Sequence, residues 1–240
     1  MPMETQLDPQ SISADLLYAV KTDGETDELR EYLATLERDR LERALRSHRH
    51  RLSFWLNCYN AYAQLLLEDD PSALDRSALS RWRFLRQESV PVAGVWLSLA
   101  DIEHGMLRSS SHPWGLGYLP RPFPSAFERS FRLESVDPRI HFALSRGEEN
   151  CPPLTVYSPV DCESELDIAT EWYIEANVSY DPETDVVQVP PVFFRYRGDF
   201  GGRSGVRAFL KKYDGIPEDT SPTLEYTEID WALEGVDFRR

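Results

Sequence analysis

The sequence predicts a single α+β domain with a helical N-terminal part and a small, mostly antiparallel sheet. Leucines recur at helical spacing through the first third of the chain, and short β-branched runs between turn residues follow later. The chain has 240 residues, of which 41% are apolar and 12% aromatic, so it can bury one large core. We find no internal repeat and no clear linker that would divide it.

The first third reads as helical, starting with a short apolar piece at 15–20. Residues 26–45 carry leucines among paired charges, which predicts one amphipathic helix with a solvated face. The basic stretch 46–51, which contains His48 and His50, is predicted to be a loop.

Residues 52–69 form the most apolar helix candidate, because apolar side chains cover more than one of its faces. Such a helix is expected to be central and buried. Asn57 and Asn60 lie three positions apart and so share one face. Because a buried amide needs hydrogen-bond partners, this pair is expected to anchor neighbouring backbone or side chains.

A hairpin is predicted at 90–97, followed by a helix over about 99–108. Ser98 and Asp101 have the spacing of a capping-box variant at the start of that helix. Residues 109–125 are rich in Pro, Gly and Ser and read as a long loop, a kind of segment that is often functional.

The remaining elements are shorter. Residues 139–144 alternate in polarity and favour a strand, with a short helix as the alternative, and 147–153 read as a turn. Further helices are expected at 163–178, 192–196 and 203–213, a strand at 186–189, and a strand or docking segment at 224–233.

The formal net charge is −15 and the isoelectric point is near 4.8. Such a surface repels phosphate backbones and anionic membranes, so neither nucleic acid nor membrane is an expected partner without a local basic patch. No apolar run approaches the length of a membrane span. The expected partner is a small molecule or a peptide.

Arginine far outnumbers lysine, since only three of the 26 basic residues are lysines: Lys21, Lys211 and Lys212. An acidic, lysine-poor and arginine-rich chain is typical of proteins adapted to high cytosolic salt, where carboxylates keep the surface hydrated. The alternative is an acidic protein from a GC-rich genome.

Three cysteines in 240 residues do not form a disulfide scaffold, and no pair has CxxC spacing. The N-terminus, 1–13, has neither the basic start nor the apolar stretch of an export signal. These features predict a reducing, cytoplasmic location, and no cofactor is expected.

Several motifs occur in a fixed order: FWLNCYN at 54–60, LADIEHGMLR at 99–108, DPRIHFAL at 137–144 and CPPL at 151–154. Together they resemble the domain of unknown function 547 family. We expect the chain to be a haloarchaeal-type member of that family. The resemblance divides the single domain 1–240 into a helical N-terminal extension at 1–49, a family core at 50–215 and a C-terminal tail at 216–240.

Cys151 precedes two prolines, which hold it in an extended conformation and could present its thiol at a fixed place. A nucleophilic cysteine needs an activating base. His141, ten residues upstream, is the first candidate and His104 the second. Asn57, Asn60, Asp101 or Glu103 could orient the imidazole, as the third member of a triad does.

Other interpretations use the same residues. The β-branched sequence after Pro152 and Pro153 is a poor helix start, which speaks against a papain-like nucleophile at a helix N-terminus. His104, His141 and Cys151 could instead hold a catalytic zinc ion, although no local ligand pair supports a metal site. Each of the three could also be a structural residue in the core.

Arg108 lies four positions after His104 and so on the same helix face, and Arg139 precedes His141 in its motif. The two arginines could bind a carboxylate or phosphate of a substrate. The alternative is a buried ion pair with Glu103 or Asp137.

The leading hypothesis is a thiol-dependent hydrolase or acyl transferase, with Cys151 as nucleophile and His141 as base. In this hypothesis Asn57 or Asn60 orients the base, and Arg108 and Arg139 hold the substrate. A non-enzymatic domain that binds a ligand or protein is the alternative, and it would bury His104, His141 and Cys151 apart from one another. A zinc-dependent enzyme is the third reading.

Overall fold

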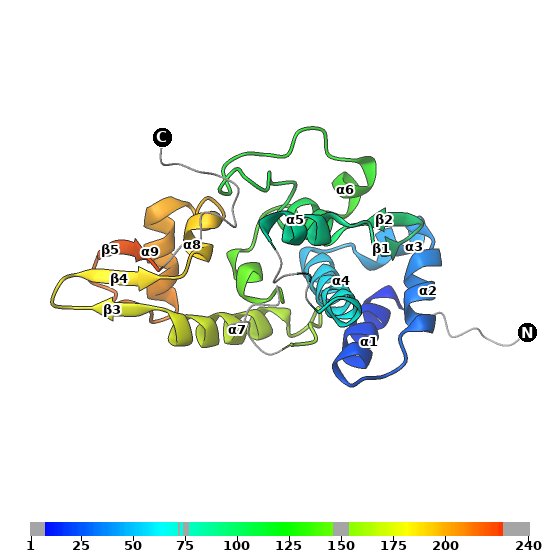
Figure 1. Ribbon diagram of the computed structural model, residues 1–240, viewed down its shortest axis with the longest axis horizontal. Coiled ribbons are helices and arrows are strands. Elements are labelled where there is room, and N and C mark those ends of the chain that lie inside the picture. Colours follow the sequence, from blue (N-terminus) through cyan, green and yellow to red (C-terminus); the bar gives the residue numbers. More distant parts are fainter. Residues whose placement is uncertain (1–7, 72, 74–76, 146–153, 228–240) are drawn as a thin grey trace, which may run out of the picture.

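The computed structural model describes residues 8–71, 73, 77–145 and 154–227 (Figure 1). Helices dominate its N-terminal part, as the sequence predicts. Four of them follow one another there: α1 (Pro9–Lys21), α2 (Asp27–Thr35), α3 (Arg38–Ala44) and α4 (His48–Asp69).

Two predicted boundaries in this part are wrong. Residues 26–45 form two helices, because the backbone is extended at Leu36 and Glu37 and turns the chain between them. His48 and His50 lie in the first turn of α4 and not in a loop, since Ser47 caps that helix by accepting a hydrogen bond from the His50 amide.

Helix α4 is the central helix of the larger hydrophobic core, as predicted. Every residue from 52 to 63 is buried, and α1 packs along the helix (Figure 1). The two asparagines anchor backbone in the way the sequence predicts. Asn57 exchanges two hydrogen bonds of 2.8 Å with the backbone of Tyr157, and Asn60 holds the Ala143 carbonyl and the Ser145 amide.

The middle of the chain covers this core. Its elements are α5 (Ala78–Arg86), the antiparallel hairpin of β1 (Val90–Val92) and β2 (Val95–Leu97), and α6 (Ala126–Phe131). The helix predicted over about 99–108, between the hairpin and α6, is confirmed, and it is a π-helix, Asp101–Leu107. The predicted capping box is present, because Asp101 N and Ser98 Oγ are 3.1 Å apart and Ser98 N and Asp101 Oδ2 are 3.2 Å apart.

The strand predicted at 139–144 is wrong, and the alternative of a short helix is confirmed, because Pro138–Phe142 is a 3-10 helix. Asp137 caps it by accepting a hydrogen bond from the Arg139 amide, and Pro138 fits the first helical position. The alternation of apolar residues has another cause: Ile140 packs into the larger core and Phe142 into a second core, so the segment lies between the two.

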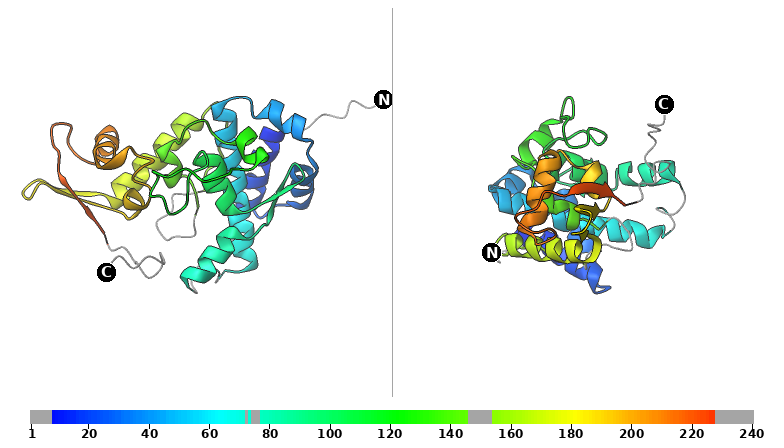
Figure 2. Two further views of the ribbon diagram at one scale, coloured as in Figure 1. Left: turned by 90° about the horizontal axis from the view of Figure 1, so that it is seen from above. Right: turned by 90° about the vertical axis from the view of Figure 1, so that its left-hand side faces the viewer.

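The C-terminal part forms that second core. Its elements are α7 (Cys162–Asn177), β3 (Ser179–Asp181), β4 (Val186–Val189), α8 (Val192–Arg195), α9 (Gly202–Lys212) and β5 (Thr223–Tyr226). The sheet has the order β3-β4-β5, antiparallel and then parallel. The α+β class is thus confirmed, and this part lies opposite the N-terminal helices along the long axis (Figures 1 and 2).

Candidate functional site

The candidate site lies between the two cores and is built around the guanidinium of Arg108. The π-helix places His104 and Arg108 on one side, so that Arg108 Nη1 lies 2.9 Å from His104 Nδ1. The other nitrogens of Arg108 reach the turn before α9, where Nε is 2.6 Å from Asp199 Oδ2 and Nη2 is 3.1 Å from Oδ1. The side chains of Arg108 and Asp199 are 0% and 1% exposed, so this is a fully buried, bidentate ion pair.

His141 shares the same carboxylate. The 3-10 helix directs its ring toward the turn before α9, and Nε2 lies 2.8 Å from Asp199 Oδ2. The side chain of His141 is fully buried. Asp199 therefore bridges an arginine from the π-helix and a histidine from the 3-10 helix, two motifs that lie 33 residues apart in sequence.

Tyr196 closes the cluster on one side. Its ring stacks on the imidazole of His141 with centroids 3.9 Å apart, and the Arg108 guanidinium lies 4.6 Å from the ring centroid. The tyrosine hydroxyl donates a hydrogen bond of 2.7 Å to Glu103 Oε1. Tyr196 thus fixes the plane of the imidazole and is itself fixed by Glu103.

The protonation states follow from these contacts. Burial alone would raise the pKa of Asp199, but hydrogen bonds from His141 and Arg108 and the positive charge of the arginine hold it below its usual value. An ionised carboxylate only accepts hydrogen bonds, so His141 Nε2 must donate to it. Neutral His141 then carries its lone pair on Nδ1.

The same argument assigns the proton on His104. An arginine only donates hydrogen bonds and stays charged, so His104 Nδ1 is the acceptor in its contact with Arg108. Neutral His104 then carries its proton on Nε2. The two histidines therefore have the same tautomer and differ in which nitrogen faces the ion pair.

The turn that holds Asp199 is fixed by the long loop 109–125. The Gly198 amide donates a hydrogen bond of 2.8 Å to the Leu116 carbonyl. Gly117 has a φ of +84°, and a Cβ there would overlap the Asp199 amide. Glycine is required at this position both by the backbone conformation and by the close approach of the two segments.

Arg139 is not part of this cluster. Its guanidinium binds Asp137 on its own segment, with 2.5 Å between Nη2 and Oδ2, and Glu163 and Asp167 on α7 at 2.6 and 2.9 Å. Tyr213 at the end of α9 also donates to Asp167. The ion pair between Arg139 and Asp137 is the arrangement that the sequence analysis gave as its alternative.

The predicted nucleophile, Cys151, and the double proline after it lie outside the described residues. The chain is described up to Ser145, which Asn60 holds, and again from Leu154. The other two cysteines are buried in the core: burial raises the pKa of the Cys58 thiol and raises that of Cys162 to about 12.

Several of the side chains expected to orient an imidazole have other partners. The amides of Asn57 and Asn60 are engaged with backbone groups, and Asp101 binds Ser98 and Arg121. The residue that contacts His141 is Asp199, which sequence reasoning missed together with Tyr196. The available signal was a single acidic residue among the glycines of 198–202, a segment that the analysis treated only as a turn.

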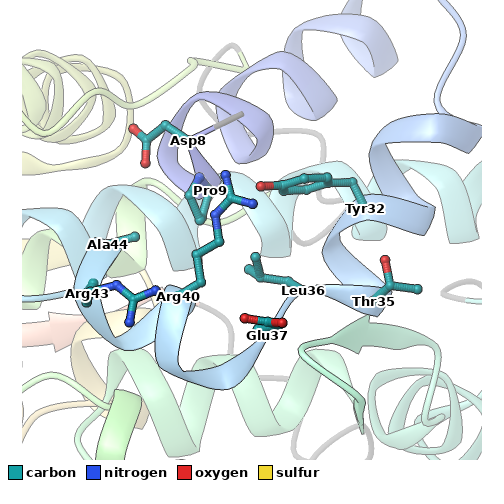
Figure 3. Close-up of a pocket in the computed structure, with 9 residues that line it drawn as sticks. All are labelled: Asp8, Pro9, Tyr32, Thr35, Leu36, Glu37, Arg40, Arg43 and Ala44. Carbon is teal, nitrogen blue, oxygen red and sulfur yellow. The ribbon is translucent and has the colours of Figure 1, made fainter. Parts of the chain in front are cut away.

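A cavity of about 530 Å³ opens elsewhere, between α1, α2 and α3. In Figure 3 the Arg40 side chain extends between Pro9 and Tyr32. The residues that line the cavity are Asp8, Pro9, Tyr32, Thr35, Leu36, Glu37, Arg40, Arg43 and Ala44. None of the predicted site residues that the structure describes borders it.

The described residues contain neither a cluster of metal ligands nor a membrane-spanning helix. Among them, no group of three or more His, Cys, Asp or Glu side chains is arranged to hold a metal ion. The zinc hypothesis also requires Cys151, which lies outside this part of the chain. No helix in the described ranges is long and apolar enough to cross a membrane.

Comparison with known families identifies the chain. Residues 43–174, more than half of its length, match the model of the family described as "Protein of unknown function, DUF547", and the chain therefore belongs to that family. The chain matches no curated protein and no solved structure. The matched segment contains His104, Arg108 and His141 but ends before Tyr196 and Asp199, so the site joins the matched segment to the part beyond it.

Proposed function

We propose that this member of the DUF547 family is a thiol-dependent hydrolase or acyl transferase, with Cys151 as nucleophile and His141 as general base. The observation that carries the proposal is the buried hydrogen bond of 2.8 Å between His141 Nε2 and Asp199 Oδ2. A carboxylate that holds one imidazole nitrogen leaves the other as the base, which is the arrangement of a catalytic triad. Asp199 takes the orienting role that the sequence analysis gave to Asn57 or Asn60.

Arg108 supports this arrangement from behind the carboxylate. Its two hydrogen bonds to Asp199 keep the carboxylate ionised and fixed in position, so Asp199 cannot take the proton from His141. We therefore infer that Arg108 is a positioning residue, and that Arg139 staples the 3-10 helix to α7. This replaces the substrate-binding role that the motif arginines suggest in sequence.

The chemistry has two balanced steps. His141 Nδ1 takes the thiol proton, and the Cys151 thiolate forms a C–S bond with a substrate carbonyl carbon. The amine or alcohol leaves with the proton from His141, which gives a thioester. Water, or an acceptor amine or alcohol, then attacks the thioester, and the thiol is restored. No cofactor enters either step.

A non-enzymatic binding domain is the second candidate. The observation that favours it is the complete burial of the His141 side chain, one of the three side chains for which the binding alternative predicts burial. In that case the ion pair and its two histidines join the two cores, and no thiolate forms.

The experiment that separates the two candidates is labelling by iodoacetamide, followed by mass spectrometry of each cysteine peptide. The enzyme proposal predicts fast labelling of Cys151 alone and slower labelling in His141→Gln, because a thiolate reacts and a thiol does not. Buried Cys58 and Cys162 serve as internal controls. Equal labelling of all three cysteines, or no labelling of Cys151, would contradict the proposal.

A further inference from the structure

Two segments of this acidic chain contain almost no acidic side chains. Asp and Glu make up 41 of the 240 residues, yet none occurs between Glu103 and Glu128. Between Asp185 and Asp214 the only one is Asp199, which is buried in its ion pair. The second segment also carries six basic residues: Arg195, Arg197, Arg203, Arg207, Lys211 and Lys212.

The two segments pack against each other. The loop 109–125 (green in Figure 1) reaches the turn between α8 and α9. Tyr118 marks the contact, because its hydroxyl would lie 3.3 Å from a Cβ on Gly202 and the Arg197 guanidinium lies 5.8 Å from its ring centroid. The two segments that contain few acidic side chains thus meet at Tyr118.

The loop presents apolar side chains from a fixed backbone. The His112 amide bonds to the Leu119 carbonyl at 2.8 Å, and the Tyr118 amide bonds to the Gly115 carbonyl at 2.8 Å. Trp114 is nevertheless 68% exposed, and Tyr118 and Leu119 are more than half exposed. Exposed aromatic side chains on an ordered loop bind with little loss of conformational entropy.

Arg197 and Arg203 supply the positive charge beside these rings. Within the described ranges, neither guanidinium has a carboxylate partner, whereas Arg121 on the same loop is paired with Asp101. Arg197 instead lies over the rings of Tyr118 and Phe194, and Arg203 is exposed in the first turn of α9. We call Trp114, Tyr118, Leu119, Arg197 and Arg203 the Arg–aromatic patch.

The patch borders the candidate site. Arg197 and Asp199 lie two residues apart in one turn, and Tyr196, next to Arg197, stacks on His141. The outer side of this turn carries the patch, while its inner side carries the carboxylate that orients the histidine. A ligand held by the patch would therefore lie against the turn that carries Tyr196 and Asp199, the two residues that contact His141.

We propose that the Arg–aromatic patch binds acidic polypeptide segments in which an aromatic or apolar residue neighbours Asp or Glu, and that such a segment is the substrate of the adjacent site. The charges supply carboxylate recognition by guanidinium groups, and the rings supply apolar contact. The substrate assignment rests on the proposed function, but the binding does not.

A polypeptide fits better than a nucleic acid for two reasons. Acyl transfer needs a carbonyl carbon, which every peptide unit supplies and a phosphodiester backbone does not. In addition, the chain outside the patch carries the net negative charge, so a long polyanion would be repelled beyond the few residues of the patch.

The test is fluorescence anisotropy of the full chain with a short fluorescein-labelled peptide of alternating glutamate and phenylalanine. We expect saturable binding that weakens as salt is added. The double variant Arg197→Gln/Arg203→Gln should lower the affinity about tenfold, because two charge-assisted contacts are lost. Tyr118→Ala should weaken binding by a smaller factor.

The chain offers a matched control on α5, where the Arg86 guanidinium lies 5.1 Å from the Trp82 ring centroid. Arg86→Gln/Trp82→Ala should leave the affinity unchanged. A peptide with glutamine in place of glutamate should bind much more weakly. The comparison of the glutamate and glutamine peptides uses the wild-type protein, so it tests the proposal even if the double variant does not fold.

Three results would overturn the inference: no saturable binding, equal affinity for the glutamine peptide, or tighter binding of a single-stranded oligothymidylate than of the acidic peptide. Binding without labelling of Cys151 would keep the docking surface and remove the enzyme. Labelling of Cys151 without peptide binding would keep the proposed enzyme and rule out the docking surface.

Discussion

Two arginine clusters meet at the 3-10 helix, which contributes His141 to one and Arg139 to the other, and they differ in burial and in composition. Arg108 binds one carboxylate and His104, and the same carboxylate also binds His141, in a place where the side chains of Arg108 and Asp199 are at most 1% exposed. Arg139 binds three carboxylates and no histidine, and two of these, Glu163 and Asp167, are 43% and 38% exposed. The same residue type in neighbouring motifs therefore has two different surroundings.

This difference indicates that the Arg108 cluster can take part in proton transfer, whereas the Arg139 cluster has a structural role. An imidazole is the side chain whose protonation changes near neutral pH, and the cluster of Arg108 contains two. Among the described residues, the ion-pair partners of Arg139 are the carboxylates of Asp137, Glu163 and Asp167, and none of them is an imidazole. Hydration of the exposed carboxylates also weakens the electrostatic coupling in the Arg139 cluster.

Arg108→Leu should have the largest effect on stability. It leaves the Asp199 carboxylate buried without its cation, which costs about 3–5 kcal/mol of unfolding free energy. Urea denaturation followed by circular dichroism measures this loss. A loss no larger than that of Arg139→Gln would erase the distinction between the clusters.

Asp199→Asn should cost about 3 kcal/mol near neutral pH, since Arg108 then loses its counter-charge. Because the folded-state pKa of Asp199 is depressed, its contribution is present above the unfolded pKa and is lost as the pH falls toward the folded pKa. The stability difference between the wild type and Asp199→Asn should therefore shrink below about pH 4. Denaturation at several pH values checks this, and a constant difference would contradict the charged role.

Arg139→Gln should cost about 2 kcal/mol, because several hydrogen bonds are lost while water reaches Glu163 and Asp167. Added salt should reduce the difference between this variant and the wild type. The salt response of Arg108→Leu should be smaller, since its ion pair is sealed from solvent.

Tyr196→Phe should have the smallest effect, about 1 kcal/mol, because one hydrogen bond to Glu103 is lost and the stacking on His141 is kept. Thermal unfolding measures the change. In the enzyme proposal, Tyr196→Ala should in addition slow the labelling of Cys151, because the imidazole loses the ring that fixes its plane. Equal labelling in both variants would remove Tyr196 from the site.

Sequence reasoning found what depends on local patterns. The apolar run at 52–69 located α4, the buried-amide argument predicted that Asn57 and Asn60 would anchor backbone, and the Ser98–Asp101 spacing predicted the cap. The alternation at 139–144 was misread because it comes from two cores on opposite sides of a 3-10 helix, and a single-core interpretation turns that into a strand.

The partner of His141 could not be found in the same way. Asp199 lies 58 residues further along the chain, and only the packing of loop 109–125 against the turn before α9 brings it to the imidazole. Nothing in the local sequence around Asp199 indicates an ion pair with Arg108. The sequence therefore predicts the two histidines of the site. The carboxylate that binds His141 and Arg108 can be identified only in the tertiary structure.

The proposed role of His141 as general base depends on which of its ring nitrogens carries the proton. Nitrogen-15 chemical shifts of the imidazole rings near neutral pH report it directly, with His141→Gln to assign the signals. We predict a neutral His141 ring protonated on Nε2 and bare on Nδ1, because Asp199 must receive a hydrogen bond. A ring protonated on Nδ1 and bare on Nε2 would contradict the account, since the lone pair would then face a carboxylate and no base would remain for Cys151.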